Sequence, residues 1–392
     1  MYGVLDRAFG LAGIRLFTAL VAASLAATLF RIALRLTVDP LRAAIVTMTA
    51  LAVSAPLWNQ RPLLLGALCF TLLVLIFGAP GRLTSHAGQW LLVPLFWFWG
   101  NVHGSWVLGA LFVALHTTGT MLDARQLPSG RDRSLLIGAI VGVITIVANP
   151  YGFEMLTFPI KLVAGTPILV LVPEWRSPSF NNLVRWPFLV WVGVLAVGIG
   201  RRWRPPWSDV IVAVVFSALG FWAVRNLVIA PIATLPIVAR SFARTPGTTP
   251  RLAIPRRADL AIALALTAAF IAITIHALGT PNFDPNDYPV AAMRAADRHG
   301  LIGKRLVTRD KDAAYVEIKY WPRQRIFFDD RYDMYPTWVG NDYRPLLTGG
   351  PGWNTTLDRV GAEVVVWPTD TPSLSSSPKT ESGPRSRADN PT

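Results

Sequence analysis

The sequence is poor in charged residues and nearly free of cysteine. Only 15% of its 392 residues are charged and 52% are hydrophobic, whereas ordinary soluble domains are roughly 25% charged. This shortage excludes a typical soluble composition. The single cysteine, Cys69, lies within an apolar run, which excludes an internal disulfide and a cysteine metal cluster. A basic n-region and a small-residue cleavage site are also lacking at the start, so we expect no removable signal peptide.

Acidic residues are scarce in the first 279 positions, which hold 8 acidic and 22 basic side chains. Residues 280–392 hold 15 of each and are neutral, so the first part carries the whole net charge of +14. In a chain with so many apolar runs, this excess indicates basic cytoplasmic loops, and we expect no nucleic-acid partner.

Apolar runs close to the ~20 residues that cross a bilayer recur along the first 279 residues. They predict an α-helical polytopic membrane protein with about 9–10 transmembrane helices in residues 1–279. The expected spans are 9–34, 41–57, 61–78, 88–101, 104–119, 134–149, 186–200, 208–224, 226–240 and 258–278.

Basic clusters fall on every second connection between these spans. They are Arg31, Arg35 and Arg42; Arg82; Arg125, Arg131 and Arg133; Arg201, Arg202 and Arg204; and Arg240, Arg244, Arg251, Arg256 and Arg257. The positive-inside rule makes all five cytoplasmic and places the other connections and residues 280–392 outside. The same alternation places Met1 outside. We therefore expect a helix and an outer loop upstream of this sequence, the alternative being a chain that starts on the outer face.

The pattern changes after residue 280. Short β-branched or aromatic runs, 304–309, 323–330 and 361–368, alternate with amphipathic segments at 288–299 and 351–360. This alternation predicts a small α/β domain over residues 280–368, outside the cytoplasm by the topology above. Residues 369–392 are rich in Ser, Pro and Thr and are expected to be disordered.

Two polar residues interrupt the long apolar stretch "FWFWGNVHGSWVLG" (96–109). Asn101 and His103, flanked by Gly100 and Gly104, stand between two expected helices at the outer boundary. One interpretation is a tight turn whose polar groups cap two helix ends. The other is a contribution to an outward-facing cavity, since polar groups in membrane segments are costly and usually face a pathway.

The outer segment 149–185 carries two further motifs. In "NPYG", Asn149 and Tyr151 belong to a turn signature at the end of a span. In "PEWRSPSF", Glu174, Trp175 and Arg176 follow one another at the outer interface. Trp175 suits an interfacial belt, but a carboxylate beside a Trp and an Arg, outside an apolar bundle, is also a candidate functional group.

Arginine stands near asparagine at the outer ends of two other spans, in "WNQRP" (Arg61) and "WAVRN" (Arg225, Asn226). Snorkelling of the long side chains is one explanation. The other is a pocket for an anionic head group, because guanidinium groups hold phosphate in a bidentate fork.

The segment "FFDDRYDMYP" (327–336) places Asp329, Asp330 and Asp333 around Arg331 at the end of an expected strand. Strand ends are common ligand sites in α/β sheets. The alternative is that Arg331 is salt-bridged to its neighbours. Carboxylates at this spacing could hold a divalent cation, but no calcium-loop spacing is present, so no residue is assigned as a metal ligand; the sequence identifies no cofactor.

Together, "NVHGSW", "NPYG", "PEWRSPSF", "RNL" and "DDRYDMYP" resemble the GT-C superfamily of glycosyltransferases, in its bacterial protein-mannosyltransferase-like branch. The resemblance covers most of residues 5–368. It implies a multi-pass protein of the bacterial plasma membrane that takes a sugar from a polyprenyl-phosphate donor on the outer face and passes it to a glycan, lipid or protein acceptor. Members carry an essential acid in the first outer loop, which would precede this sequence; the low-complexity tail also departs from the pattern.

The resemblance implies roles for the residues above. Glu174 is the candidate base for the acceptor, and His103, Arg61 and Arg225 would serve the phosphate; the remaining candidates for substrate binding are Asn101, Asn149, Tyr151, Trp175, Arg176, Asn226, Asp329, Asp330 and Arg331. Two other classes stay open. One is a non-catalytic scaffold or degenerate transferase; the other is a transporter or flippase, although no charged relay or inverted repeat supports it.

Overall fold

The computed structural model describes residues 2–58, 61–78, 86–165, 172–202, 204–243, 275, 285–332 and 335–368. The chain divides into two compact units. Unit 1 comprises residues 1–163 and 170–280, and unit 2 comprises residues 164–169 and 281–392. Arg82, most of the last basic cluster, the expected tenth span, Asp333 and the expected disordered tail lie outside the described residues.

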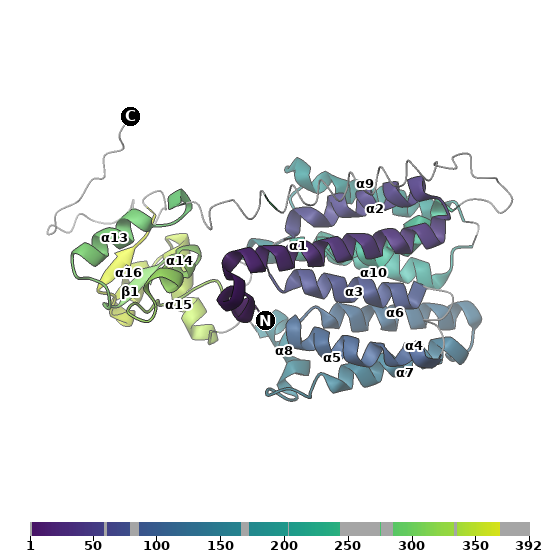
Figure 1. The fold of residues 1–392 in the computed structure, drawn as a ribbon, viewed down its shortest axis with the longest axis horizontal. Helices are drawn as coiled ribbons and strands as arrows, with labels where there is room; N and C mark the ends of the chain where they lie inside the picture. Colours follow the sequence, from purple (N-terminus) through teal and green to yellow (C-terminus); the bar gives the residue numbers. More distant parts are fainter. Residues whose placement is uncertain are drawn as a thin grey trace. The chain divides into compact units, whose positions relative to one another are not determined.

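Unit 1 is a bundle of apolar helices (Figure 1). Its helices are α1 (Tyr2–Thr37), α2 (Pro40–Ser54), α3 (Leu63–Gly78), α4 (His86–Trp90), α5 (Leu92–Val102), α6 (Trp106–Ala124), α7 (Gly130–Thr145), α8 (Glu154–Gly165), α9 (Trp186–Gly200), α10 (Trp207–Trp222) and α11 (Ala230–Ser241). Short 3₁₀ helices η1 (Ala55–Leu57), η4 (Pro173–Trp175), η5 (Leu183–Arg185) and η6 (Val224–Leu227) join or extend them.

Several of these helices are long and apolar enough to cross a membrane. Five such segments occur among the described residues: Arg7–Thr37, Pro40–Leu57, Trp106–Ala124, Leu183–Gly200 and Val224–Ser241. Helices α3 and α10 are apolar but shorter. The expected span at 88–101 is divided into α4 and α5, and α8 was not expected as a helix. The prediction of an α-helical membrane protein is confirmed.

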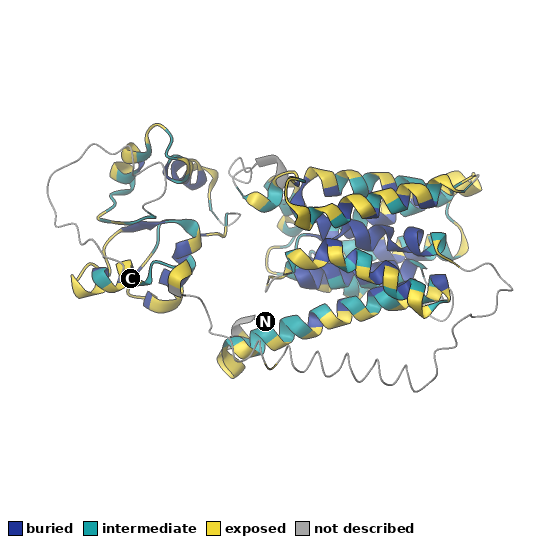
Figure 2. Cartoon of the chain, turned by 90° about the horizontal axis from the view of Figure 1, so that it is seen from above, coloured by how far each residue is buried: buried dark blue, intermediate teal, exposed yellow. Residues whose placement is uncertain are grey.

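The outward faces of the bundle are apolar as well as its interior. Large side chains such as Met48, Ile140, Val190 and Val214 are each at least half exposed. Figure 2 shows buried residues gathered in the middle of the bundle and exposed ones along its outer faces. An apolar exterior of this kind is typical of a protein in the hydrocarbon core of a bilayer. In water, the same surface would expose large apolar patches, which soluble monomers rarely do.

Helix α11 occupies the centre of the bundle. Every residue from Ala230 to Ala239 is buried, and the helix packs against α1, α2, α3, α9 and α10. In the window of Val224–Ser241, 83% of residues are buried, whereas the other four candidate spans reach 22–33%. A helix that is apolar all round is expected at the core of such a bundle.

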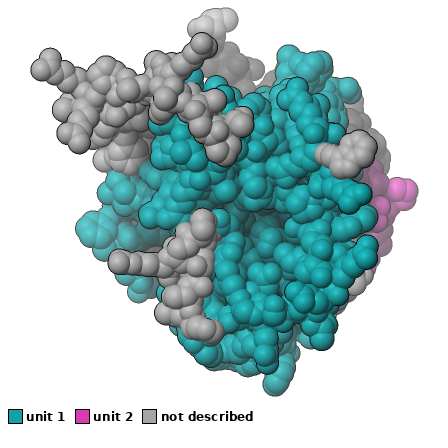
Figure 3. All heavy atoms as spheres, turned by 90° about the vertical axis from the view of Figure 1, so that its right-hand side faces the viewer, with its two compact units in different colours: residues 1–163, 170–280 teal, residues 164–169, 281–392 magenta. Residues whose placement is uncertain are grey.

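The basic connections gather at one end of unit 1. The guanidinium of Arg42, on α2, donates to the carbonyl of Phe242, which follows α11, at 2.9 Å. Arg131, on α7, donates to the carbonyls of Ile76 and Phe77 at the end of α3. We call this end the basic end. Helix α1 ends on the right-hand side of Figure 1, and Figure 3 shows unit 1 viewed from that side. The opposite end, with the turn between α5 and α6, is the His103 end.

Unit 2 contains a parallel pair of strands and several helices. Strand β1 (Leu306–Thr308) pairs with β2 (Val364–Val366), with Leu306 opposite Val364. The helices are α13 (Val290–Arg298), α14 (Asp310–Tyr320), α15 (Thr337–Thr348) and α16 (Trp353–Val360), and a 3₁₀ turn, η7, covers Pro285–Asp287. The first and third expected strands and both expected helices are present.

The prediction of a strand at 323–330 is wrong. The segment makes only an isolated bridge, between Ile326 and Leu306. Two side-chain interactions keep this segment out of the sheet. The ring of Phe328 stacks on Tyr343 with centroids 4.2 Å apart, and Asp329 accepts the backbone N–H of Arg331 at 2.8 Å. The sequence interpretation also missed α14, which precedes this segment in the chain, and α15, which follows it.

Candidate functional site

An ion pair at the His103 end joins two of the expected site residues. Arg61 precedes α3, and Glu174 lies in η4; the Nη1 of Arg61 is 2.5 Å from Oε1 of Glu174. The side chain of Arg61 is 53% exposed and that of Glu174 is 34% exposed. Because both groups remain open to solvent, the pair contributes little to stability, and its charges are accessible to a ligand.

The segment with Glu174 is held against η6 by backbone contacts. The N–H of Val224 donates to the carbonyl of Arg176 at 2.9 Å, and the hydroxyl of Ser177 donates to the carbonyl of Trp222 at 3.1 Å. These bonds bring the guanidinium of Arg225 over the ring of Trp175, 4.1 Å from its centroid. A cation–π contact of this kind fixes the position of the charge.

His103 lies in the turn between α5 and α6 and belongs to a local hydrogen-bond network. Its Nδ1 accepts the N–H of Ser105 at 3.1 Å and is 2.8 Å from the Ser105 hydroxyl. The indole of Trp99 donates to that hydroxyl at 3.0 Å. Since Nδ1 accepts, the imidazole carries its proton on Nε2 when it is neutral.

Gly66 of α3 makes room for this network. A Cβ at this position would lie 2.4 Å from the Ser105 hydroxyl oxygen and 3.3 Å from Nδ1 of His103. The missing side chain therefore lets α3 approach the turn closely. Ser105, Trp99 and Gly66 were missed by sequence reasoning; the only signal was the serine two residues after His103 in "NVHGSW".

His103 is neutral at pH 7. Burial in the turn and, as the smaller cause, the positive charge of Arg225 together lower its pKa to about 4. Arg225 is therefore close enough for its charge to reach the imidazole. A neutral imidazole with its proton on Nε2 can donate a hydrogen bond from that atom; that His103 serves a phosphate stays a prediction. Direct contacts link Arg61 to Glu174 and Arg225 to Trp175, the residue that follows Glu174.

The expected asparagines bond to the backbone of their own segments. Asn101 donates to the carbonyl of Trp97 at 2.7 Å, and Asn226 donates to the carbonyl of Leu219 at 2.9 Å. Asn149 donates to the carbonyl of Ile146 and accepts the N–H of Tyr151. For Asn101 this contact fits the interpretation of a turn whose polar groups bond to a helix end; a role of the three asparagines in substrate binding stays a prediction.

The "NPYG" turn lies beside the end of α5, because the indole of Trp97 donates to the carbonyl of Ala148 at 3.1 Å. Within that turn, the side chain of Tyr151 is 66% exposed. Arg176 is exposed and contributes its carbonyl to the bond with Val224.

The acidic motif of unit 2 is largely engaged in structural contacts. The guanidinium of Arg331 donates to Asp329 and, at 2.8 Å, to Glu317, and this bonding to Asp329 raises the pKa of Arg331. Asp329 is buried, whereas Asp330 is exposed. Within the described residues, no three His, Cys, Asp or Glu side chains group as a metal site would require. The salt-bridge interpretation accounts for Asp329 and Arg331.

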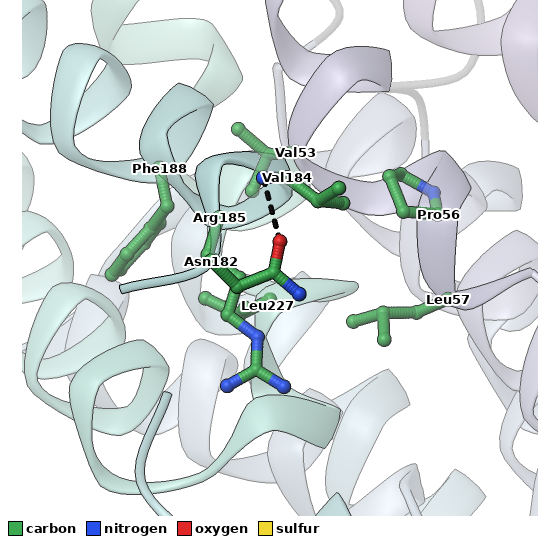
Figure 4. Close-up of a pocket in the computed structure, with 8 residues that line it drawn as sticks. All are labelled: Val53, Pro56, Leu57, Asn182, Val184, Arg185, Phe188 and Leu227. Carbon is green, nitrogen blue, oxygen red and sulfur yellow. Dashed lines mark hydrogen bonds between the residues drawn. The ribbon is translucent and has the colours of Figure 1, made fainter. Parts of the chain in front are cut away.

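A pocket of about 200 Å³ opens at the His103 end (Figure 4). Its lining comes from α2, η1, η5, α9 and η6: Val53, Pro56, Leu57, Asn182, Val184, Arg185, Phe188 and Leu227. Figure 4 shows the Asn182 amide and the Arg185 guanidinium among apolar side chains, with Asn182 accepting the N–H of Val184. The pocket thus offers an apolar surface with one cationic side chain, that of Arg185. Its lining residue Leu227 follows Arg225 by two positions in the chain. Sequence reasoning did not single out Asn182 or Arg185.

No family model matches this chain, and no curated protein matches it. The resemblance to GT-C glycosyltransferases therefore stands on the motifs quoted above, and what it implies for activity enters as a proposal.

Proposed function

We propose that the protein is a GT-C-type membrane glycosyltransferase that uses a polyprenyl-phosphate sugar at its His103 end. The observation that supports this proposal is the grouping of two arginines, a glutamate, a tryptophan and a neutral histidine from four separate connections at one end of an apolar bundle. Such a group can bind a charged head group while the lipid tail stays in the membrane.

The arginines suit the phosphate of the donor. Arg225 is half-buried and lies over Trp175, and Arg61 pairs with Glu174, the residue before Trp175. As the bond between the anomeric carbon and the phosphate oxygen breaks, its electron pair leaves with the phosphate. Guanidinium groups placed beforehand stabilise that growing negative charge, which is commonly a large term in catalysis.

Glu174 suits the acceptor. In the transfer, the acceptor hydroxyl oxygen bonds to the anomeric carbon of the sugar, and its proton passes to the carboxylate. The anomeric carbon is oxocarbenium-like during this exchange, as in glycoside hydrolysis. Oε1 of Glu174 contacts Arg61, and the carboxylate is one-third exposed, so an acceptor approaching from the aqueous side can reach it.

The Arg61–Glu174 pair also favours a second candidate. A carboxylate engaged by a guanidinium is less available as a base, so the same end could bind a lipid phosphate without transferring its sugar. This would be the scaffold or degenerate transferase, with the head-group site retained.

A transfer assay separates these candidates. Membranes containing the full chain are given a polyprenyl phosphate that carries a radiolabelled hexose, with boiled membranes as control. Protein-dependent movement of label to a new product supports the transferase. Saturable binding of unlabelled polyprenyl phosphate without transfer supports the scaffold. Absence of both binding and transfer would overturn the proposal.

The proposed topology places the basic end in the cytoplasm and the His103 end outside, at the plasma membrane of a bacterium, with unit 2 also outside. The basic clusters carry this prediction, because cytoplasmic loops retain Lys and Arg. Reporter fusions after Arg133 and after residue 300 test it. Cytoplasmic signal is expected at the first site and external signal at the second; the same signal at both would contradict the model.

A further inference from the structure

A second groove lies at the basic end of unit 1, on the surface where α9 and α11 meet. Its volume is about 300 Å³, and its lining residues are Val190, Gly193, Val194, Val197, Gly198, Arg201, Ser241 and Phe242. It runs along α9 from Val190 to Arg201, whereas the pocket at the His103 end has Phe188, near the start of α9, in its lining.

Two glycines of α9 shape this groove in different ways. A Cβ on Gly198 would lie 2.3 Å from the hydroxyl oxygen of Ser241, so its absence lets α9 and α11 touch at the basic end. A Cβ on Gly193 would meet nothing within 4 Å, so its absence leaves open space. The exposed faces of Val190 and Val197 continue that space along α9. The result is an apolar slot that faces away from the core.

Positive charge gathers where the slot reaches the basic end. Asp209 is 5% exposed and already pairs with two guanidinium groups, those of Arg202 at 2.7 Å and of Arg240. Arg201 lines the groove, is exposed, and pairs with no carboxylate in the described part of the chain. Two guanidinium groups thus share the carboxylate of Asp209, and Arg201 adds a further positive charge at this end of the groove, so the local excess is positive.

We infer that this groove binds an anionic phospholipid, with its phosphate at Arg201 and an acyl chain along Gly193, Val194 and Val197. Basic pockets between transmembrane helices are known to hold acidic head groups, and each Arg near such a surface contributes on the order of 1 kcal/mol. The alternative occupant is the segment that follows Ala243. Residues 244–257 contain no acidic residue and four basic ones, Arg244, Arg251, Arg256 and Arg257, so this segment offers no negative charge to Arg201, whereas an anionic lipid does. The inference depends on the membrane bundle and not on the proposed transferase activity.

Two variants separate the head-group contact from the acyl slot. Arg201→Ala removes the free guanidinium, and Arg133→Ala, an exposed arginine on α7 at the same end, removes equal charge away from the groove. Gly193→Leu fills the slot with a side chain that meets no protein atom at its Cβ. Ala23→Leu adds the same side chain on an exposed position of α1.

The experiment titrates the full chain in detergent with phosphatidylglycerol or phosphatidylcholine of identical acyl chains, read by native mass spectrometry and by the shift of the melting temperature. The wild type is expected to bind phosphatidylglycerol more tightly. Arg201→Ala should weaken phosphatidylglycerol binding about fivefold, the equivalent of one arginine, and leave phosphatidylcholine unchanged. Gly193→Leu should weaken both lipids. The two control variants should behave as the wild type does.

Three outcomes would overturn the inference. Equal binding of both lipids by the wild type would remove the charge argument. Equal losses in Arg133→Ala and Arg201→Ala would indicate a general surface effect. A fall in the melting temperature of lipid-free Gly193→Leu, with no saturable lipid binding by the wild type, would show that another part of the chain fills the groove.

Discussion

Replacing Arg225 with alanine is expected to lower the rate of sugar transfer by about 10²–10³, the usual cost of removing one preorganised donor from a site where negative charge develops. The expectation rests on the proposed transferase. Arg225 is half-buried and lies 4.1 Å above the ring of Trp175. Its charge therefore lies in a medium that screens it less than water does.

The measurement is transfer of labelled sugar in membranes with equal amounts of each protein. Arg133→Ala, at the other end of the bundle, is the matched control and should transfer at the wild-type rate. The transfer rate of Arg225→Lys should lie between the rates of Arg225→Ala and Arg133→Ala. The lysine retains the positive charge but loses the bidentate fork of the guanidinium. Wild-type transfer by Arg225→Ala would identify a snorkelling side chain whose head group is already in water.

A methyl group at Gly119 is expected to destabilise the bundle by about 3 kcal/mol, the upper part of the range for overpacking. Gly119 lies in α6, and its Cβ would stand 2.2 Å from Cα and 2.4 Å from N of Ser208 in α10. Backbone atoms cannot rotate aside. The same junction is tied by Asp123, which accepts the N–H of Trp207 at 2.7 Å, so the helices cannot separate without losing that bond.

Thermal unfolding of purified Gly119→Ala in detergent tests this expectation through a lowered melting temperature. Gly193→Ala is the control, since a Cβ there meets nothing within 4 Å, and it should melt as the wild type does. Equal melting temperatures for both variants would show that α6 and α10 are held less closely than the structure indicates.

Hydropathy predicted most of unit 1 because the interior and the exterior of the bundle are both apolar, so a span shows in the sequence whichever way it faces. The method failed where helices are short or interrupted. Helix α8 carries Pro159 in its interior, and α4 has only five residues. In unit 2, α15 contains Pro345, which reads as a turn, and the contacts of Phe328 and Asp329 that pull 323–330 out of the sheet involve partners such as Tyr343.

The candidate site was predicted in part for a topological reason. Alternating spans bring every second connection to the same end, so Arg61, His103, Glu174 and Arg225 could be assigned to one end from the sequence alone. Whether each side chain faces a ligand or its own backbone depends on rotamers. That is why Asn101, Asn149 and Asn226 read like ligand-binding groups and turn out to bond to helix carbonyls.

The burial of α11 has a consequence for how the chain enters the membrane. Its window has the lowest mean hydropathy of the five candidate spans, 1.2, while its residues are the most completely enclosed by protein. Because α11 is weakly hydrophobic, its transfer into lipid contributes little free energy to insertion. Packing against the other helices must therefore stabilise it in the membrane. During synthesis it follows α1, α2, α3, α9 and α10, the helices that surround it. The last-made of the described helices of unit 1 is therefore received by a ring assembled before it, and truncation ahead of α11 would leave that ring around an unfilled centre.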